Sequence, residues 1–367
     1  MSPSLRFPEF NGEWKEFSLG EIGDSFIGLT YKPTDTVPSG GIIVFRSSNI
    51  QDGCIDYKDI VRVNKKVREN LITKNGDLLI CARNGSSRLI GKNALLHRTD
   101  ANQTFGAFMM VFRSDKNHFV HHLLNTKRYT SQVAENLGAR INQITSSDLS
   151  SFRFFFPKDD KEMTRIASLF DLLDGRIVVQ NRLIDRLQSL MIGIAQKIAH
   201  SNKPNVRISD CLECSSSALQ ESEVNKTGKY PVYGANGIVG YIDKYHTQNE
   251  AIYIIKDGSG VGGVSYVTGK CSSTGTLNIL QARNGHSLKY LYYLLKVFNF
   301  EPYKTGMAIP HIYFKDYGKA KIFCPAYPEQ LEYAKLFSSI DGNLRIALDS
   351  LKNFNLQKQY LLRQMFI

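Results

Sequence analysis

The sequence has no long uninterrupted apolar run. A helix that crosses a membrane needs about 20 consecutive, mostly apolar residues, and no stretch of the 367 residues approaches that length. Residues 1–10 are polar and contain proline, so they lack the apolar core of a secretory signal. We therefore expect a cytoplasmic protein with no membrane partner.

Cysteine is scarce, with six residues in the chain, and only Cys211 and Cys214 form a C-x-x-C pair. A structural zinc ion needs four ligands, and no second Cys/His pair follows at the usual spacing. In a chain without a secretory signal, reduced thiols are the default. The spacing therefore predicts ordinary buried thiols and no metal site.

The motifs of several enzyme classes are also missing. The chain has no G-x-x-x-x-G-K-[ST] phosphate loop and no H-E-x-x-H zinc motif. It also lacks the Asn/Asp-Pro-Pro-Tyr/Phe motif expected of an adenine methyltransferase; the nearest string, 324–327, has neither the amide nor the second proline. We therefore expect no catalytic residues in this chain.

One glycine-rich segment, 258–263, fits the pattern G-x-G-x-x-G. In a dinucleotide-binding unit that pattern opens a helix, whose N-terminus faces the pyrophosphate. Residues 264–269 are instead typical of a strand. The segment is interpreted as a glycine-rich hairpin, and a dinucleotide-binding enzyme is kept as a minor alternative.

What the chain does have is positive charge, +12 in total with a pI near 9.3. The excess of Lys and Arg is shared between residues 1–160 and residues 202–328. A single basic tail would concentrate it, so this distribution favours two folded basic surfaces and an acidic polymer as partner.

The chain also repeats itself. Ile144 matches Ile312 and Pro157 matches Pro325 at a separation of 168, and Asp174-Gly175 matches Asp341-Gly342 at 167. In both copies a short apolar strand ends at a proline and a long periodic segment follows. The repeat predicts two similar halves of α/β type, with strands near 41–46, 77–82, 107–112 and 152–156, and near 251–255, 264–267, 277–280 and 321–323.

The periodic segments step by alternating fours and threes, the spacing of a coiled coil. The predicted seams are Leu173, Ile177, Ile184, Leu187, Met191, Ile194 and Ile198 in the first copy, and Ile340, Leu344, Leu351, Phe354, Leu361 and Met365 in the second. A helix of about 40 residues would be about 60 Å long, far longer than the average globular helix. We expect two antiparallel spacer helices.

In its arrangement the chain resembles the specificity subunits of type I restriction-modification systems. The resemblance rests on the lead-in segment 14–22, weakly echoed at 206–211, and on the joint Phe154-Phe155-Phe156-Pro157 followed by the helix start 165–177. The second helix start, 331–344, is more diverged. The resemblance implies target-recognition domains at 1–158 and 203–327, separated by antiparallel coiled-coil helices at 159–202 and 328–367.

It further implies a non-catalytic chain that recognises a split, asymmetric site in double-stranded DNA. Two methyltransferase subunits, which bind S-adenosylmethionine and methylate adenine N6, would dock on the helices. Restriction subunits that use ATP and Mg²⁺ would join through the complex, so the chain itself would hold no cofactor. A free-standing DNA-binding regulator is the main alternative.

Candidate DNA contacts are polar and basic residues in loops, because Arg pairs with guanine edges, Asn and Gln with adenine, and Lys with phosphate. They are Lys32, Arg46, Asn49, Arg83, Asn84, Arg88, Arg140, Asn142 and Gln143 in the first domain, and Asn236, Lys256, Ser259, Lys304 and His311 in the second. The conspicuous His121-His122 pair is interpreted as satisfied or exposed side chains, without a metal.

Overall fold

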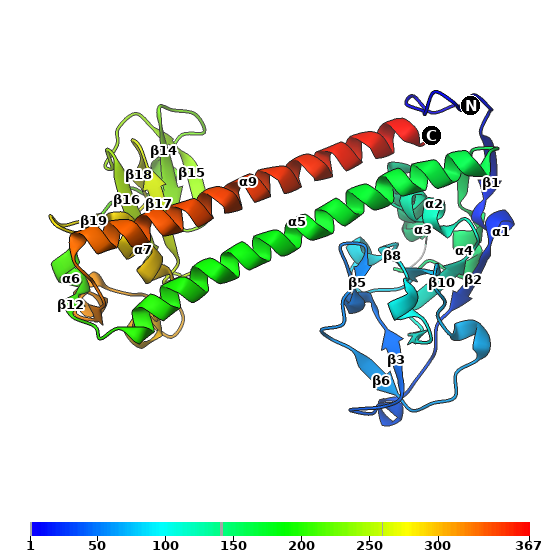
Figure 1. Ribbon diagram of the computed structural model, residues 1–367, viewed down its shortest axis with the longest axis horizontal. Helices are drawn as coiled ribbons and strands as arrows, with labels where there is room; N and C mark the ends of the chain where they lie inside the picture. Colours follow the sequence, from blue (N-terminus) through cyan, green and yellow to red (C-terminus); the bar gives the residue numbers. More distant parts are fainter. Residues whose placement is uncertain (1, 140–141, 259) are drawn as a thin grey trace. The chain divides into compact units, whose positions relative to one another are not determined.

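The structure, a computed structural model, describes residues 2–139, 142–258 and 260–367. The chain divides into two compact units. Unit 1 comprises residues 1–179 and 351–367, and unit 2 comprises residues 180–350. Each unit therefore consists of a globular part and a segment of each long helix. The colours in Figure 1 follow the sequence through both units.

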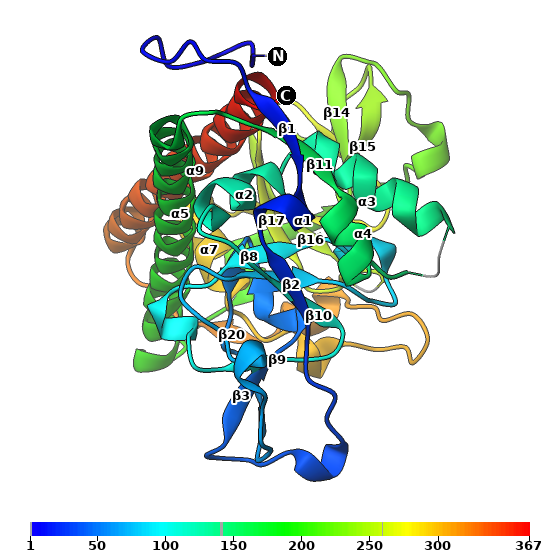
Figure 2. The same cartoon turned by 90° about the vertical axis from the view of Figure 1, so that its right-hand side faces the viewer.

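The main sheet of unit 1 has four antiparallel strands, in the order β2 (Asp24–Ile27), β10 (Met109–Arg113), β7 (Leu78–Cys81) and β8 (Asn93–Leu95). A smaller sheet has the order β6 (Val61–Val63), β3 (Ile42–Phe45) and β9 (Thr104–Phe105). In Figure 2, β1 (Lys15–Ser18) lies beside its antiparallel partner β11 (Arg153–Phe156). A hairpin of β4 (Ile50–Gln51) and β5 (Cys54–Ile55) completes the strands described in this unit.

Unit 2 repeats this topology. Its four-stranded antiparallel sheet has the order β13 (Leu212–Ser216), β19 (Leu277–Ala282), β16 (Glu250–Ile255) and β17 (Val264–Thr268). The three-stranded sheet has the order β15 (Gly237–Ile242), β14 (Tyr230–Gly234) and β18 (Ser272–Ser273). Strand β12 (Val206–Arg207) pairs with β20 (Lys321–Ile322). In both three-stranded sheets the central strand has one antiparallel and one parallel neighbour, so the two halves share a fold.

The predicted strands are confirmed in both units, with ends shifted by one or two residues. The hairpin interpretation of segment 258–263 is also confirmed, because β16 and β17 pair antiparallel on either side of it. The Ile255 N–H donates to the Gly263 carbonyl, and the Gly262 N–H donates to the Ile255 carbonyl. A strand follows the glycines, so they do not open a helix.

Short helices connect the strands. They are α1 (Leu19–Ile22), α2 (Asn117–Leu123), α3 (Lys127–Ala139) and α4 (Ser146–Ser151) in unit 1, and α6 (Ile208–Cys211), α7 (Leu288–Lys296) and α8 (Phe314–Tyr317) in unit 2. Short 3-10 helices occur at Pro33–Asp35, Ser47–Asn49, Glu69–Leu71, Ser87–Leu89, Arg98–Asp100, Glu221–Glu223 and Glu301–Tyr303. Sequence analysis missed α3, although Tyr129, Val133 and Leu137 recur every four residues and pack on the core.

The two long helices are α5 (Asp160–Ser201, 42 residues) and α9 (Tyr327–Met365, 39 residues), drawn in green and orange-red in Figure 1. Within unit 1, Phe170 of α5 contacts Phe366 just beyond α9, and the Lys358 ammonium lies 2.5 Å from Asp174. Residue numbers rise along α5 as they fall along α9, so this pair is antiparallel. Within unit 2, the Gln180 side chain donates to the Ala347 carbonyl at 2.9 Å.

None of the predicted seam residues is exposed. Leu173, Ile184, Met191, Ile198, Ile340, Leu344 and Met365 are buried, and Ile177, Leu187, Ile194, Leu351, Phe354 and Leu361 are partly buried. Leu173 and Met365 belong to the unit 1 core, where Leu361 packs against it. The 3.5-residue spacing therefore identified the helix face that meets other side chains.

A buried polar side chain anchors the start of each long helix. Glu162 accepts two hydrogen bonds from the Arg6 guanidinium, at 2.6 and 2.7 Å, and one from the Trp14 indole. At the matching position, Gln330 accepts from the Ser287 N–H and donates to the Pro325 carbonyl, both at 2.8 Å. Among the described residues, no helix is both long and apolar enough to cross a membrane.

Candidate nucleic-acid interface

A surface groove of about 670 Å³ opens in unit 1 between the two sheets' loops. It is lined by Leu29–Tyr31, Pro33, Thr36, Arg46–Ser48, Val61 and Gly106–Met109. Phe108, which precedes β10, is 59% exposed. A large exposed aromatic ring beside an arginine is a surface suited to stacking and polar contacts with a ligand.

The loop that follows β7 contacts two residues that line this groove. The Arg83 guanidinium lies over the Phe108 ring, 5.3 Å from its centre, in a cation–π contact. The Asn84 amide donates to the Ser47 hydroxyl at 3.1 Å. These contacts connect the loop that carries Arg83 and Asn84 to the separate loop that carries Arg46.

Residues 142 and 143 contact the same loop. The Asn142 side chain donates to the Gly85 carbonyl at 3.2 Å, and Gln143 forms an isolated β-bridge with Arg83. Asn142 has φ near 44°, a left-handed conformation that Asn tolerates better than most residues. The structure thus brings together Arg46, Arg83, Asn84, Asn142 and Gln143 from the predicted set.

Asn49 requires a correction. Its side chain is fully buried, its amide donates to the carbonyls of Asp56 and Asp59, and its oxygen accepts from the Arg46 N–H. Its side-chain amide is therefore not available to a base, and its hydrogen bonds instead hold the backbone near Arg46 in place. Sequence alone could not separate this asparagine from an exposed one, because the distinguishing hydrogen bonds come from residues 7 and 10 positions away.

Of the remaining unit 1 candidates, Lys32 and Arg88 are exposed and do not line the groove, and Arg140 lies outside the described residues. Arg46 itself is half-buried, and its guanidinium pairs with the Asp59 carboxylate at 2.7 Å. A base or phosphate that binds Arg46 would therefore compete with Asp59.

In unit 2 the corresponding face is built from the end of β16 and the loop 304–313. The His311 ring lies 2.7 Å from the Asp257 carboxylate, and His311 exchanges backbone hydrogen bonds with Thr305. The Gly258 N–H donates to the Pro310 carbonyl, which ties the glycine hairpin to the same loop. Met307, at the tip, is fully exposed.

Among the predicted residues of unit 2, Lys304 and His311 lie in this loop and Lys256 contacts it. Lys256 directly follows β16 and is partly buried, and its backbone carbonyl accepts from the Ile312 N–H. Lys304 pairs with Glu301 at 2.5 Å. Asn236 is exposed in the turn between β14 and β15, and Ser259 lies outside the described residues.

The two faces occupy matching places in the fold. Gln143 and His311 are separated by the repeat distance, and each forms a bridge to the loop after the third strand of the main sheet, at Arg83 and at Asp257. Sequence analysis missed Phe108 and Met307. Phe108 sits in an apolar string that reads as a buried strand, whereas Met307 lies in a glycine-flanked loop where exposure was foreseeable.

Two groups of side chains among the described residues have ligand atoms close enough to hold a metal ion. The first, His121, His122 and Asp174, is part of a hydrogen-bonded core. His121 contacts the Asn93 side chain at 3.0 Å and His122 contacts Asp171 at 3.0 Å. Burial lowers the pKa of His121 to about 3, so this ring is neutral near pH 7. The second group is Cys211, His286 and Cys324.

The chain shows sequence similarity to curated specificity subunits. It is 31% identical over 125 residues to the type I restriction enzyme EcoKI specificity subunit of Escherichia coli (strain K12), covering 32% of this chain and 27% of that protein. It is 23% identical over 193 residues to the StySPI specificity subunit of Salmonella potsdam, covering 50% and 41%. The matched regions thus span less than half the length of these relatives.

Solved structures share the fold. The S subunit of a type I restriction-modification system from M. genitalium has a TM-score of 0.70 at 18% identity, covering 100% of this chain and 99% of that chain. A chain from work on complex assembly and conformational transition of the type I R-M system has a TM-score of 0.52 at 16% identity, covering 98% of each.

The family described as type I restriction modification DNA specificity domain matches the chain twice, over residues 11–189 and 201–353. The two matches each cover one copy of the repeated topology and the beginning of the long helix that follows it. The chain therefore belongs to the type I restriction modification DNA specificity domain family.

Proposed function

We propose that this chain is the DNA-recognition subunit of a type I restriction-modification complex and that each unit reads one part of a split, asymmetric site. One observation carries the proposal: the same strand order occurs in both units, yet matching loops present different residues. Two copies of one reader would recognise a symmetric site. Two readers with different loops recognise two different sequences.

The loop chemistry suits base readout. Arg83 presents a fork of donors that pairs with the O6 and N7 of guanine in the major groove, and Asn142 and Gln143 can pair with adenine. Lys256 and Lys304 supply positive charge for phosphates in the second unit. The Phe108 and Met307 side chains offer apolar contact, for example with a thymine methyl group.

The long helices would act as the spacer between the two readers. At 1.5 Å per residue, 42 residues of α5 give about 63 Å of helix. DNA rises about 34–36 Å per turn, so a spacer of this length suits half-sites one to two turns apart. The unread gap would then depend on helix length, and the bases read would depend on the loops.

The helices also carry exposed apolar side chains that lie outside the predicted coiled-coil seams. Exposed residues on α5 are Leu172, Val179, Leu183, Leu190 and Ile192, and those on α9 include Leu336, Ile346, Leu348, Leu356 and Tyr360. Leu172, Val179, Leu183 and Leu190 follow heptad steps along α5. We assign these faces to two methyltransferase subunits, which would supply S-adenosylmethionine-dependent adenine methylation. Restriction subunits using ATP and Mg²⁺ would join through them.

The test is co-expression with a methyltransferase subunit, followed by mapping of methylated adenines. Adenine N6 methylation at one split site, present only when both chains are present, supports the proposal. Exchanging residues 83–88 for another loop should change one half of the site alone. Leu183→Glu with Leu190→Glu should prevent co-purification, whereas Gln188→Glu, an exposed polar control on the same helix, should not.

Other outcomes would overturn it. Tight binding to a specific DNA sequence by a chain that ignores the methyltransferase would identify a free-standing regulator. Stoichiometric nucleotide binding by the isolated chain would favour the dinucleotide-binding alternative.

A further inference from the structure

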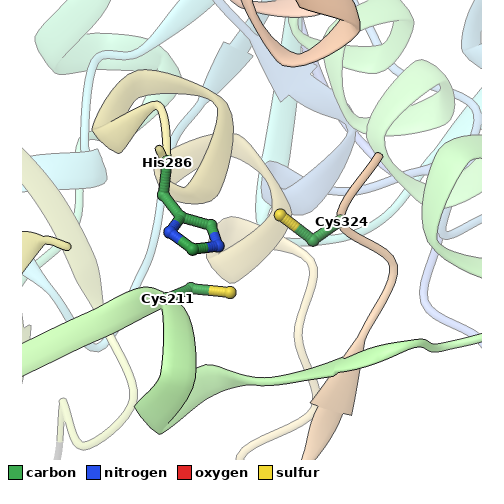
Figure 3. A group of neighbouring side chains, drawn as sticks. All are labelled: Cys211, His286 and Cys324. Carbon is green, nitrogen blue, oxygen red and sulfur yellow. The ribbon is translucent and has the colours of Figure 1, made fainter. Parts of the chain in front are cut away.

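Two cysteines and a histidine from distant parts of the sequence meet in unit 2. Cys211 ends α6, His286 lies in the turn before α7, and Cys324 follows β20. One ligand atom from each lies within 4.8 Å of the others. Figure 3 shows the two sulfur atoms and the imidazole ring gathered around one small volume. Cys214, the C-x-x-C partner of Cys211, is not part of this group.

Hydrogen bonds fix the backbone at all three positions. The Asn205 side chain donates to the Cys324 carbonyl and accepts from the Cys324 N–H, both at 2.8 Å. The Cys211 carbonyl accepts from the Arg283 N–H at 2.8 Å, and the Arg283 carbonyl accepts from the His286 N–H at 3.1 Å. The backbone at all three positions is therefore held in place by neighbouring segments of the unit.

One polar atom of this group has no hydrogen-bond partner. Cys211 and Cys324 are buried, and the Nδ1 atom of His286 is buried without a hydrogen-bond partner.

We propose that Cys211, His286 and Cys324 bind one zinc-class divalent ion, with solvent as the fourth ligand. Thiolate and imidazole are the donors that Zn²⁺ prefers, and in tetrahedral geometry such donors lie roughly 3.5–3.8 Å apart. Because the donor atoms lie within 4.8 Å of one another, metal binding needs each pair to approach by about 1.3 Å or less.

The charge balance favours this ion in a buried place. Binding displaces one proton from each thiol into solvent, so Zn²⁺ and two thiolates sum to zero net charge. A neutral assembly avoids the cost of a buried ion. His286 is only partly buried, which leaves a solvent side for the fourth ligand and for ion entry.

The matching place in unit 1 is apolar. Ile22 ends α1 as Cys211 ends α6, and Phe156 precedes Pro157 as Cys324 precedes Pro325. Both Ile22 and Phe156 pack in the unit 1 core. The ion would thus join α6, the start of α7 and the start of α9 in unit 2, where unit 1 uses hydrophobic packing.

The test uses the full chain, free of any affinity tag, treated with chelator under reducing conditions and titrated with Co²⁺ and then Zn²⁺. We expect one equivalent of Co²⁺ with a thiolate-to-cobalt charge-transfer band, displaced by Zn²⁺, and a higher melting temperature with Zn²⁺. Cys211→Ser and Cys324→Ser should lose the band, and Cys214→Ser should keep it. His286→Gln, which retains both thiols, should weaken Zn²⁺ binding by more than about tenfold.

Three results would overturn the proposal: no stoichiometric metal in the folded chain, a charge-transfer band that survives in Cys211→Ser and Cys324→Ser, or a Cys211–Cys324 disulfide in the native protein. Circular dichroism of each variant separates loss of the ion from loss of the fold. The measurement needs neither DNA nor a partner, so its outcome is independent of the proposed recognition function.

Discussion

Units 1 and 2 have the same strand order but differ in the side chains at matching positions. The start of the long helix is anchored by a buried carboxylate, Glu162, in unit 1 and by a neutral amide, Gln330, in unit 2. The partners differ too: a charged guanidinium from Arg6 in the first case, and backbone groups in the second.

Comparing the two anchors shows which features of this position the fold requires. Both anchors are long polar side chains in the first turn of the helix, and both are fully hydrogen-bonded, which is what a buried polar group requires. Charge is not conserved between the copies, but hydrogen-bond satisfaction is. The loops can diverge further, because the side chains of Arg83 and Asp257 contact Phe108 and His311, which lie in loops outside the strands.

The largest effect should come from removing the two anchors. Glu162→Ala leaves the Arg6 guanidinium largely buried without its partner and should destabilise unit 1 by about 3–5 kcal/mol. Gln330→Ala leaves one N–H and one carbonyl unpaired and should destabilise unit 2 by about 1–3 kcal/mol. Trp14, the single tryptophan, reports on unit 1 in urea unfolding, and hydrogen exchange along α7 reports on unit 2. Equal losses in both units would refute the distinction between charged and neutral anchors.

The loops that carry Arg83 and His311 should each affect base preference in a different half of the DNA site. Arg83→Ala should weaken binding to the specific DNA by about 1–3 kcal/mol, which is roughly 5- to 150-fold, and relax base preference in one half-site. His311→Ala should relax the other half. Arg182→Ala, an exposed arginine on α5, is the control for general charge loss. If either loop variant changes both halves, the units do not read separately.

Unit 1 should also lose stability as the pH falls. In unit 1 the pKa of buried His121 is about 3, below the usual 6.5, so the unfolded chain binds a proton that the folded chain excludes. This contribution is complete above pH 6.5 and declines as the pH falls toward 3. Unit 1 should lose about 1 kcal/mol from this residue between pH 6.5 and 5.5, and about 1.4 kcal/mol per pH unit below that until the pH approaches 3. His121→Gln should flatten that slope in Trp14-detected unfolding; an unchanged slope would exclude His121 as its source.

The smallest effect concerns polar positions within the helix seam. Lys358 and Asp174 form a partly exposed ion pair in unit 1, so Lys358→Met should cost less than about 1 kcal/mol. In unit 2, Gln180→Ala removes the hydrogen bond to Ala347 and should cost about 1 kcal/mol. Hydrogen exchange along α5 measures both. A loss above roughly 3 kcal/mol for Lys358→Met would show that the pair behaves as a buried one.

Features with a fixed period were predictable from the sequence. The heptad steps identified the buried face of both long helices, and β-branched runs between turns located the main strands. Features that depend on distant residues were not. Phe108 is exposed and Asn49 is buried because of loops far along the chain, and the Cys211–His286–Cys324 group spans more than 100 residues. A search for local metal spacing therefore could not find it.

We propose that the loops determine which bases are read and that the long helices determine the distance between the two half-sites. Deleting one heptad from each long helix, 181–187 and 344–350, removes about 10.5 Å of helix, or about three base pairs of DNA. Methylated-adenine mapping with this variant should return the same two half-sites with a gap shorter by about three base pairs. Different half-site bases, or an unchanged gap, would contradict these roles of the loops and the helices.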